Sequence, residues 1–159
     1  MRPILIAAVV FGAACSKPVQ TVAPSGGPAM VAAAFLQAVA DSNLSQMGEL
    51  WGTSRGPAAS TNNPSNWGQR VAVIHSYLKG GRARVIGEGD PALAKGDRRQ
   101  VLVELTRGTC VRTVPFTMVR TRDGGWLVNS VDLNAAGTPS RPCSPSSAGT
   151  PPSDRAFIR

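Results

Sequence analysis

The sequence is poor in the side chains that most often catalyse reactions or bind metals. Among its 159 residues are one His, one Tyr and nine acidic residues. If Cys15 is modified, the two other thiols and one imidazole are too few ligands for a structural zinc site. The metalloprotease pattern His-Glu-x-x-His and the phosphate-loop pattern Gly-x-x-x-x-Gly-Lys-Ser/Thr do not occur, and we expect no nucleophile elbow of the hydrolase type. We therefore expect neither a metal nor a cofactor.

Aromatic residues are also scarce, at 5% of the chain. The formal net charge of +8 comes mostly from Arg, but no basic block is interleaved with the aromatics on which bases stack. We therefore expect no nucleic-acid partner. Two interpretations of the charge stay open: a solvated, Arg-rich sheet surface, or attraction to anionic headgroups or cell-wall polymers.

The apolar run of residues 4–15 is too short to span a bilayer, which takes about twenty residues. The run follows a single positive charge, Arg2, and ends in a Gly-Ala-Ala stretch before Cys15. A basic start, an apolar core and small residues at the cleavage point are typical of a secretory signal peptide. We expect residues 1–14 to be that signal, and the Pro-, Gly- and Ser-containing residues 15–27 to be a flexible tether.

The end of the run resembles the lipobox of bacterial lipoproteins, although Gly12 stands where that family prefers Leu. The resemblance implies that Cys15 is linked to diacylglycerol and becomes the acylated N-terminus, so that the lipid bilayer is a partner. Ser16, a residue other than Asp, implies the periplasmic face of the outer membrane in the proteobacterial members. A cleaved, secreted form without lipid is the alternative.

The two remaining cysteines, Cys110 and Cys143, suit a disulfide in an oxidising compartment. The bond would close a loop of about 33 residues and stabilise the fold by roughly 3.5–4 kcal/mol in the chain-entropy model. It would pin a Gly-, Pro- and Ser-rich tail, residues 136–159, which we otherwise expect to be irregular or disordered.

Three segments after the tether have helical periodicity. They cover about residues 28–41, 44–51 and 63–79, and a polar loop is expected at residues 53–63 between the last two. The third helix carries the strongest apolar stripe of the chain, which consists of Trp67, Val71, Ile74 and Leu78. We expect this stripe to be buried against a sheet.

Beyond Gly81 the apolar residues alternate with a period of two, as in half-buried strands. Asp123-Gly124 predicts a hairpin with a type I′ turn. Pro115 cannot donate to a ladder, so we expect a bulge or an edge-facing position there. The expected strands cover about residues 83–88, 101–106, 110–118 and 126–133.

This order predicts an α+β fold with three N-terminal helices packed on a curved, mainly antiparallel sheet of about four strands. Residues 28–135 resemble the nuclear-transport-factor-2-like superfamily, a cone of helices against a curved sheet. The resemblance depends on the opening helix 29–41, the break Asp41-Ser42-Asn43-Leu44, the short helix that ends in Leu50-Trp51, and the hairpin at residues 123–128.

A cone of this kind can hold a pocket. We name five candidate pocket residues, although a small core needs the same aromatic side chains: Phe35, Trp51, Trp67, His75 and Phe116. A small apolar ligand or an envelope protein is the expected partner.

The resemblance also suggests an enzyme alternative, because isomerases and dehydratases of this fold place Asp, Tyr or His inside the cone. His75 would be the base here, with a nearby acid such as Asp132, Asp41 or Glu104. We expect Asp132 to point outward from the last strand and Asp41 to cap a helix, so we favour a binding protein that is not an enzyme. A structural spacer at the membrane is the third possibility.

Overall fold

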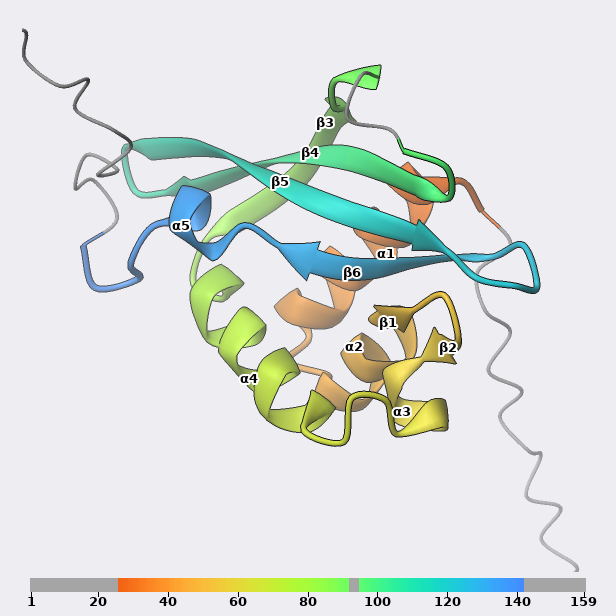
Figure 1. Cartoon of the computed structure of the whole chain (residues 1–159). Helices are drawn as coiled ribbons and strands as arrows, with labels where there is room; N and C mark the ends of the chain where they lie inside the picture. Colours follow the sequence, from red (N-terminus) through yellow and green to blue (C-terminus); the bar gives the residue numbers. More distant parts are fainter. Residues whose placement is uncertain (1–25, 92–94, 142–159) are drawn as a thin grey trace, which may run out of the picture.

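The computed structural model describes residues 26–91 and 95–141. They form an α+β domain in which a four-stranded antiparallel sheet covers a layer of helices (Figure 1). The expected class and the four-stranded antiparallel sheet are therefore confirmed. The count of three helices is not confirmed, because a further short helix lies among those described before the large sheet. Residues 1–14, Cys15 and Cys143 lie outside the described residues, so the predictions for them stay predictions.

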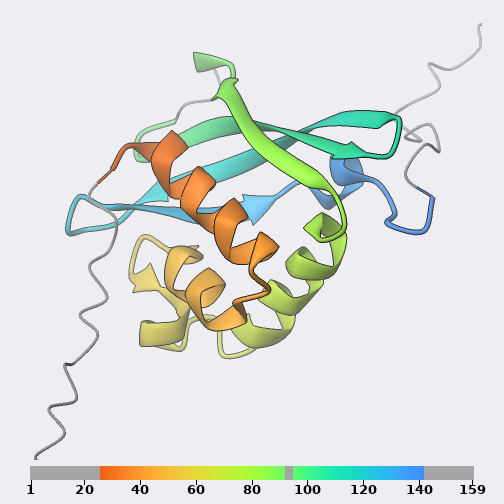
Figure 2. The ribbon, with the colours of Figure 1, turned by 180° about the vertical axis from the view of Figure 1, so that it is seen from behind.

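Helix α1 (Pro28–Ala40) crosses the inner face of the large sheet and contacts all four of its strands (Figure 2). Pro28 stands at the start of the helix, where its missing N–H leaves no hydrogen bond unmade. The helix ends at Ala40 with Asp41 as its C-cap, and Ser42 follows in the left-handed region with φ 53°. The buried side of α1 consists of Val31, Ala32, Phe35, Leu36, Ala38 and Val39.

Helix α2 (Leu44–Leu50) is capped by Asn43, whose side chain accepts a hydrogen bond from the Gln46 N–H at 3.0 Å. The expectation that Asp41 caps this helix is wrong. The Asp41 carboxylate instead accepts a hydrogen bond from the Gln37 side chain one turn earlier in α1, at 3.0 Å. Asn43 is the residue that stands directly before the first helical turn, as an N-cap requires.

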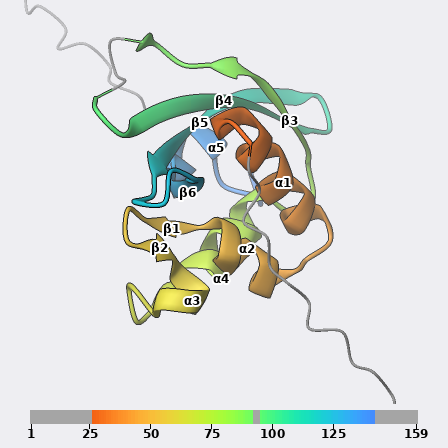
Figure 3. The same ribbon diagram turned by 90° about the vertical axis from the view of Figure 1, so that its right-hand side faces the viewer.

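The segment expected to be a polar loop contains structure of its own. Strands β1 (Gly52–Thr53) and β2 (Gly56–Pro57) pair as a small antiparallel sheet, and helix α3 (Ala58–Thr61) follows. Two-residue strands and a four-residue helix are too short to show a hydrophobic period. This small sheet lies close to α2 and to strand β6 (Trp126–Val131) of the large sheet (Figure 3). The backbone amide of Ala58 donates to the Trp51 carbonyl at 2.8 Å.

Helix α4 (Trp67–Leu78) begins later than the expected start at Asn63-Pro64. Three residues of its stripe are buried, as predicted: Val71 and Leu78 are 0% and 1% exposed, and Ile74 is 6% exposed. The expected packing of the stripe against the sheet is not confirmed, because the backbone of α4 comes closest to α2. Trp67, the first residue of the stripe, is only partly buried and packs against the edge of the core.

The large sheet has the order β3 (Arg82–Glu88), β4 (Arg98–Arg107), β5 (Cys110–Arg120) and β6 (Trp126–Val131). Phe35 of α1 meets Phe116 of β5 edge to face, with ring centroids 6.1 Å apart, so helix and sheet share one core. The inner face of β4 and β5 is apolar and consists of Val101, Val103, Leu105, Val114, Phe116 and Met118.

Pro115 lies in β5, an inner strand of the large sheet, opposite Leu102 of β4, so the expected edge-facing position is not confirmed. The bulge in β5 and β6 lies nearby, at Thr117 and Met118, and not at Pro115. The Pro115 carbonyl accepts from the Asp132 N–H at 3.0 Å, just beyond the end of β6. The amide nitrogen of a strand residue points to the same side as its carbonyl. The missing N–H of Pro115 therefore costs no bond to β4.

Two local predictions for the last strands are wrong. The hairpin at Asp123-Gly124 exists, but only Gly124 has a positive φ, 86°, and its N–H bonds to the Thr121 carbonyl; this suits a three-residue loop with a glycine bulge rather than a type I′ turn. The last strand ends at Val131, not at residue 133. Asp132 caps the short helix α5 (Leu133–Ala136), accepting from the Ala135 N–H at 3.0 Å.

Candidate functional site

A pocket of about 350 Å³ lies between α4 and β6. We call it the Trp51 pocket. Residues of α4 and the turn before it form one wall, and β6 with the first residue of α5 forms the other. Its lining consists of Trp51, Asn66, Gln69, Arg70, Val73, Ile74, Asn129, Ser130, Val131 and Leu133. The volume is at the lower end of the range for small-molecule sites.

Trp51 is positioned by two elements. It directly follows α2, and its backbone forms an isolated parallel bridge with Val128 of β6. The residue is 5% exposed, and its indole Nε1 is buried without a hydrogen-bond partner. Buried polar groups are nearly always hydrogen-bonded, and an unmade hydrogen bond costs about 1–3 kcal/mol. The pocket is therefore lined by a residue whose indole donor has no partner in the described structure.

A bulge in β6 places Asn129 at the pocket wall. Thr117 pairs with Ser130 and Met118 with Val128, so Asn129 is the extra residue that has no partner on β5. Such bulges redirect a side chain and are frequent next to functional sites. The side-chain amide of Asn129 donates to the Gly52 carbonyl at 2.8 Å, which holds the side chain in place.

The remainder of the pocket combines an apolar wall with a polar rim. Val131 and Leu133 pack against the core, while Val73 is 47% exposed at the opening. Arg70 supplies the only formal charge in the lining, and its Nε donates to the Asn66 side-chain oxygen at 3.0 Å. This combination suits a ligand with an apolar body and a hydrogen-bond acceptor.

The structure does not bring the five predicted pocket residues together. Phe35 and Phe116 are both 0% exposed and belong to the core. The Trp67 ring lies over Gly48 of α2, where a Cβ atom would overlap it. Trp51 alone of the five lines the Trp51 pocket. Aromatic content could not separate core from pocket, because both need large apolar rings.

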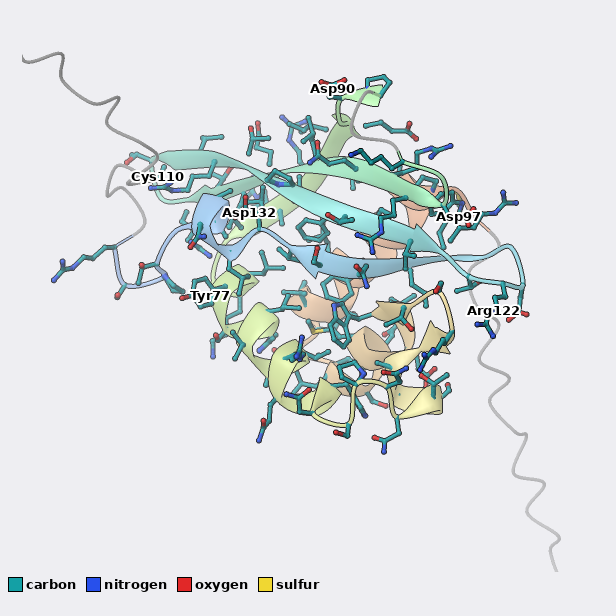
Figure 4. The ribbon with its side chains drawn as sticks, viewed as in Figure 1. Tyr77, Asp90, Asp97, Cys110, Arg122 and Asp132 are labelled. Atoms are coloured by element: carbon teal, nitrogen blue, oxygen red, sulfur yellow. The ribbon has the colours of Figure 1, made fainter. Side chains whose placement is uncertain are left out.

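His75, the fifth predicted residue, lies on the opposite flank of α4. Its Nε2 is 3.2 Å from the Ser42 hydroxyl oxygen. None of the acids named for the enzyme alternative bonds to it in the described structure: Asp41 accepts from Gln37, Asp132 caps α5, and Glu104 pairs with Arg84 at 2.8 Å. Asp132 is exposed, as predicted. Figure 4 shows it beside α5 at the end of β6.

A Gly-x-Ser-x-Gly run, contrary to our expectation, is present at Gly52-Thr53-Ser54-Arg55-Gly56. It forms the turn between β1 and β2 and not the strand-to-helix turn of a hydrolase. Ser54 is exposed, and His75, the one histidine, contacts a different serine. We therefore assign this run no nucleophilic role.

A wider groove of about 840 Å³ lies between α1 and the edge strand β3. Its walls include Leu36, Gln37, Ser42, Arg82 and Arg84. The sequence analysis did not predict this groove, because its walls come from a helix and a strand about 40 residues apart. Hydrophobic periods are local and do not show which distant segments meet. The groove contains no buried donor left without a partner.

Cys110, at the start of β5, takes part in a disulfide. Its expected partner, Cys143, lies outside the described residues, so the pairing stays a prediction. The described residues contain no group of three His, Cys, Asp or Glu side chains that could hold a metal ion. None of the described helices has the length and apolar character needed to cross a membrane.

Comparison with known proteins adds no relative: no family model, no curated protein and no solved structure matches this chain.

Proposed function

We propose that this protein is an exported lipoprotein of the cell envelope whose domain binds a small ligand in the Trp51 pocket. The observation that carries the proposal is that Trp51, whose buried indole N–H has no partner, lines a pocket. The helices and the large sheet would then form a cone similar to the nuclear-transport-factor-2-like superfamily, with the ligand between helix and sheet.

The lining indicates the chemistry of the ligand. Ile74, Val131 and Leu133 favour an apolar body. The indole N–H calls for an acceptor such as a carbonyl or ether oxygen, and a hydrogen bond to it would remove the cost of the buried donor. With Arg70 as the only charge, the pocket suits a neutral amphiphilic molecule or one with a single negative charge.

The proposed anchor is Cys15, acylated and joined to α1 by residues 15–27. A fully extended segment of this length spans roughly 45 Å at about 3.5 Å per residue. The domain could therefore reach molecules well above the bilayer surface while staying attached to it. Each buried methylene of the acyl chains adds about 0.8 kcal/mol to membrane binding.

The ligand proposal can be tested on the full chain purified from envelope membranes in mild detergent. Native mass spectrometry should detect a retained small molecule on the wild type. Trp51→Phe keeps an apolar ring but removes the donor, so we expect retention to fall about tenfold, the equivalent of about 1.4 kcal/mol. Trp126→Phe, outside the pocket lining, is the matched control and should retain the molecule.

Equal retention by Trp51→Phe and the wild type would contradict the proposed site. Absence of any small molecule from all three proteins would instead favour the structural-spacer alternative.

The anchor is tested separately with Cys15→Ser. We expect the variant to leave the detergent phase on phase partitioning, or to stay uncleaved, while its domain still binds the ligand. Unchanged partitioning with normal cleavage would contradict lipidation and leave the proposal for the pocket intact.

A further inference from the structure

The inner row of β4 ends in a charge. Val101, Val103 and Leu105 point into the core at alternate positions, and Arg107 continues the row. Its side chain is 7% exposed, and Arg107 is the only charged or polar residue among the buried residues described. Burying a cation without a partner is costly, so its surroundings require an explanation.

Arg107 uses only part of its guanidinium group. Nη1 donates to the Ala136 carbonyl at 2.9 Å, at the end of α5. Nε and Nη2 are buried and have no hydrogen-bond partner. These two atoms form one edge of the planar group, and two parallel N–H bonds from such an edge match the two oxygens of a carboxylate or phosphate.

Arg107 lies near a second cation, Arg112. Burial lowers the pKa of the Arg107 guanidinium, and the neighbouring Arg112 lowers it further. An arginine nevertheless stays protonated in proteins. No carboxylate of residues 26–91 and 95–141 forms an ion pair with Arg107, so its charge is not balanced within the described structure.

The surrounding backbone comes close to the arginine. A Cβ atom at Gly81, between α4 and β3, would lie 2.9 Å from Arg107 Cγ. The Arg112 side chain is equally close to Gly137, next to the carbonyl that Arg107 binds. Arg107 therefore lies among the α4–β3 connection, the end of α5 and the start of β5. This is the end of the sheet at which Figure 4 labels Cys110.

We propose that Arg107 is the base of a second site, which binds a small oxyanion of the carboxylate or phosphate type through the Nε–Nη2 edge. The site is separate from the Trp51 pocket, whose lining does not include Arg107. Because the edge is shielded from water, a charge-assisted hydrogen bond formed there is stronger than one at the surface.

A purely structural role is the alternative. In that case Arg107 would only connect α5 to β4 through its Nη1 hydrogen bond. The identity of the anion in solution would then change neither the Arg107 signal nor the stability of the protein. Arg107→Lys separates the two roles. Lysine keeps a positive charge that can reach the Ala136 carbonyl, but it cannot form two parallel N–H hydrogen bonds to an oxyanion. Arg98→Lys, at an exposed position of the same strand, is the matched control.

The test is a titration of the full chain, ¹⁵N-labelled in mild detergent, with inorganic phosphate and, in a second arm, acetate. Chloride replaces each anion at constant ionic strength. We expect the Arg107 Nε–H signal to shift in a saturable way with at least one oxyanion and not with chloride. Arg98→Lys should keep the saturable thermal stabilisation by that oxyanion, and Arg107→Lys should bind it at least about tenfold more weakly.

The two arms distinguish the sources of the anion, since a response to acetate alone indicates a carboxylate ligand and a response to phosphate indicates a phosphate ligand. An unshifted Arg107 signal in both arms, or equal stabilisation of wild type and Arg107→Lys, would overturn the proposal. If Arg107→Lys does not fold, the wild-type titration still decides. Trp51→Phe should respond like the wild type, which keeps this result independent of the ligand proposal.

Discussion

The two flanks of α4 face different surroundings. On one flank, His75 contacts the Ser42 hydroxyl in the turn between α1 and α2. On the other, Val73 and Arg70 face β6 across the Trp51 pocket. The one imidazole of the chain thus lies across the helix from the pocket that Trp51 lines.

The difference bears on the choice between binding and catalysis. A general base must lie within hydrogen-bond reach of the proton that it removes, directly or through one water. A ligand in the Trp51 pocket would be separated from His75 by the body of α4. The groups that would meet such a ligand are an indole, amides and apolar side chains, and these favour binding over proton transfer.

The largest effect should come from the buried stripe between the two flanks. Leu78→Ala removes a side chain that is 1% exposed, so we expect the free energy of unfolding to fall by about 2–5 kcal/mol. Val73→Ala, at the pocket opening, should change it by less than about 1 kcal/mol. Urea denaturation of both variants measures the contrast. Similar losses would mean that Val73 belongs to the core and not to a pocket.

A smaller effect is expected where the start of α4 meets α2. A Cβ at Gly48 would overlap the Trp67 ring, so Gly48→Ala should destabilise the protein by about 1–3 kcal/mol. Gly68→Ala is the control, because nothing lies within 4 Å of its Cβ position; it should add up to about 1 kcal/mol of stability. Two variants of equal stability would disprove the contact between Gly48 and Trp67.

The turn opposite His75 should be less sensitive. Asn43→Ala removes the side chain that caps α2 and should lower the free energy of unfolding by about 1 kcal/mol. Ser45→Ala, exposed within α2, should be neutral or slightly stabilising, because alanine favours helix. An unaffected Asn43→Ala variant would show that the cap adds nothing to stability.

Sequence periodicity predicted the α4 stripe and the alternation of β4 and β5 because the apolar side chains there repeat over ten or more residues. It missed β1, β2, α3 and α5, which are too short to show a period and depend on contacts with distant segments, such as the hydrogen bond from Asn129 to Gly52. Trp51 was predicted as a pocket residue. Asn129 was not, because only the pairing register of β5 and β6 reveals its bulge.

Dependence on distant contacts also explains why the sequence analysis did not predict that Arg107 is buried. In the sequence, Arg107 is one of many arginines, and it precedes a turn, where charged side chains are usually solvated. Only the continuation of the inward alternation from Val101 to Leu105 could have signalled that it points into the fold. Its unpartnered edge depends on α5, which the sequence pattern did not predict.

The smallest expected effect is that of His75→Ala. The residue is half-buried and its partner Ser42 is exposed, so water can replace the lost hydrogen bond and stability should change by about 0.5 kcal/mol or less. Ser42→Gly removes the same bond but suits the positive φ of 53°, so it should be neutral or stabilising. Denaturation and native mass spectrometry on both variants would check this. If His75→Ala lost the retained molecule while Trp51→Phe kept it, the functional flank of α4 would be the one with the imidazole, and the enzyme alternative would replace the binding proposal.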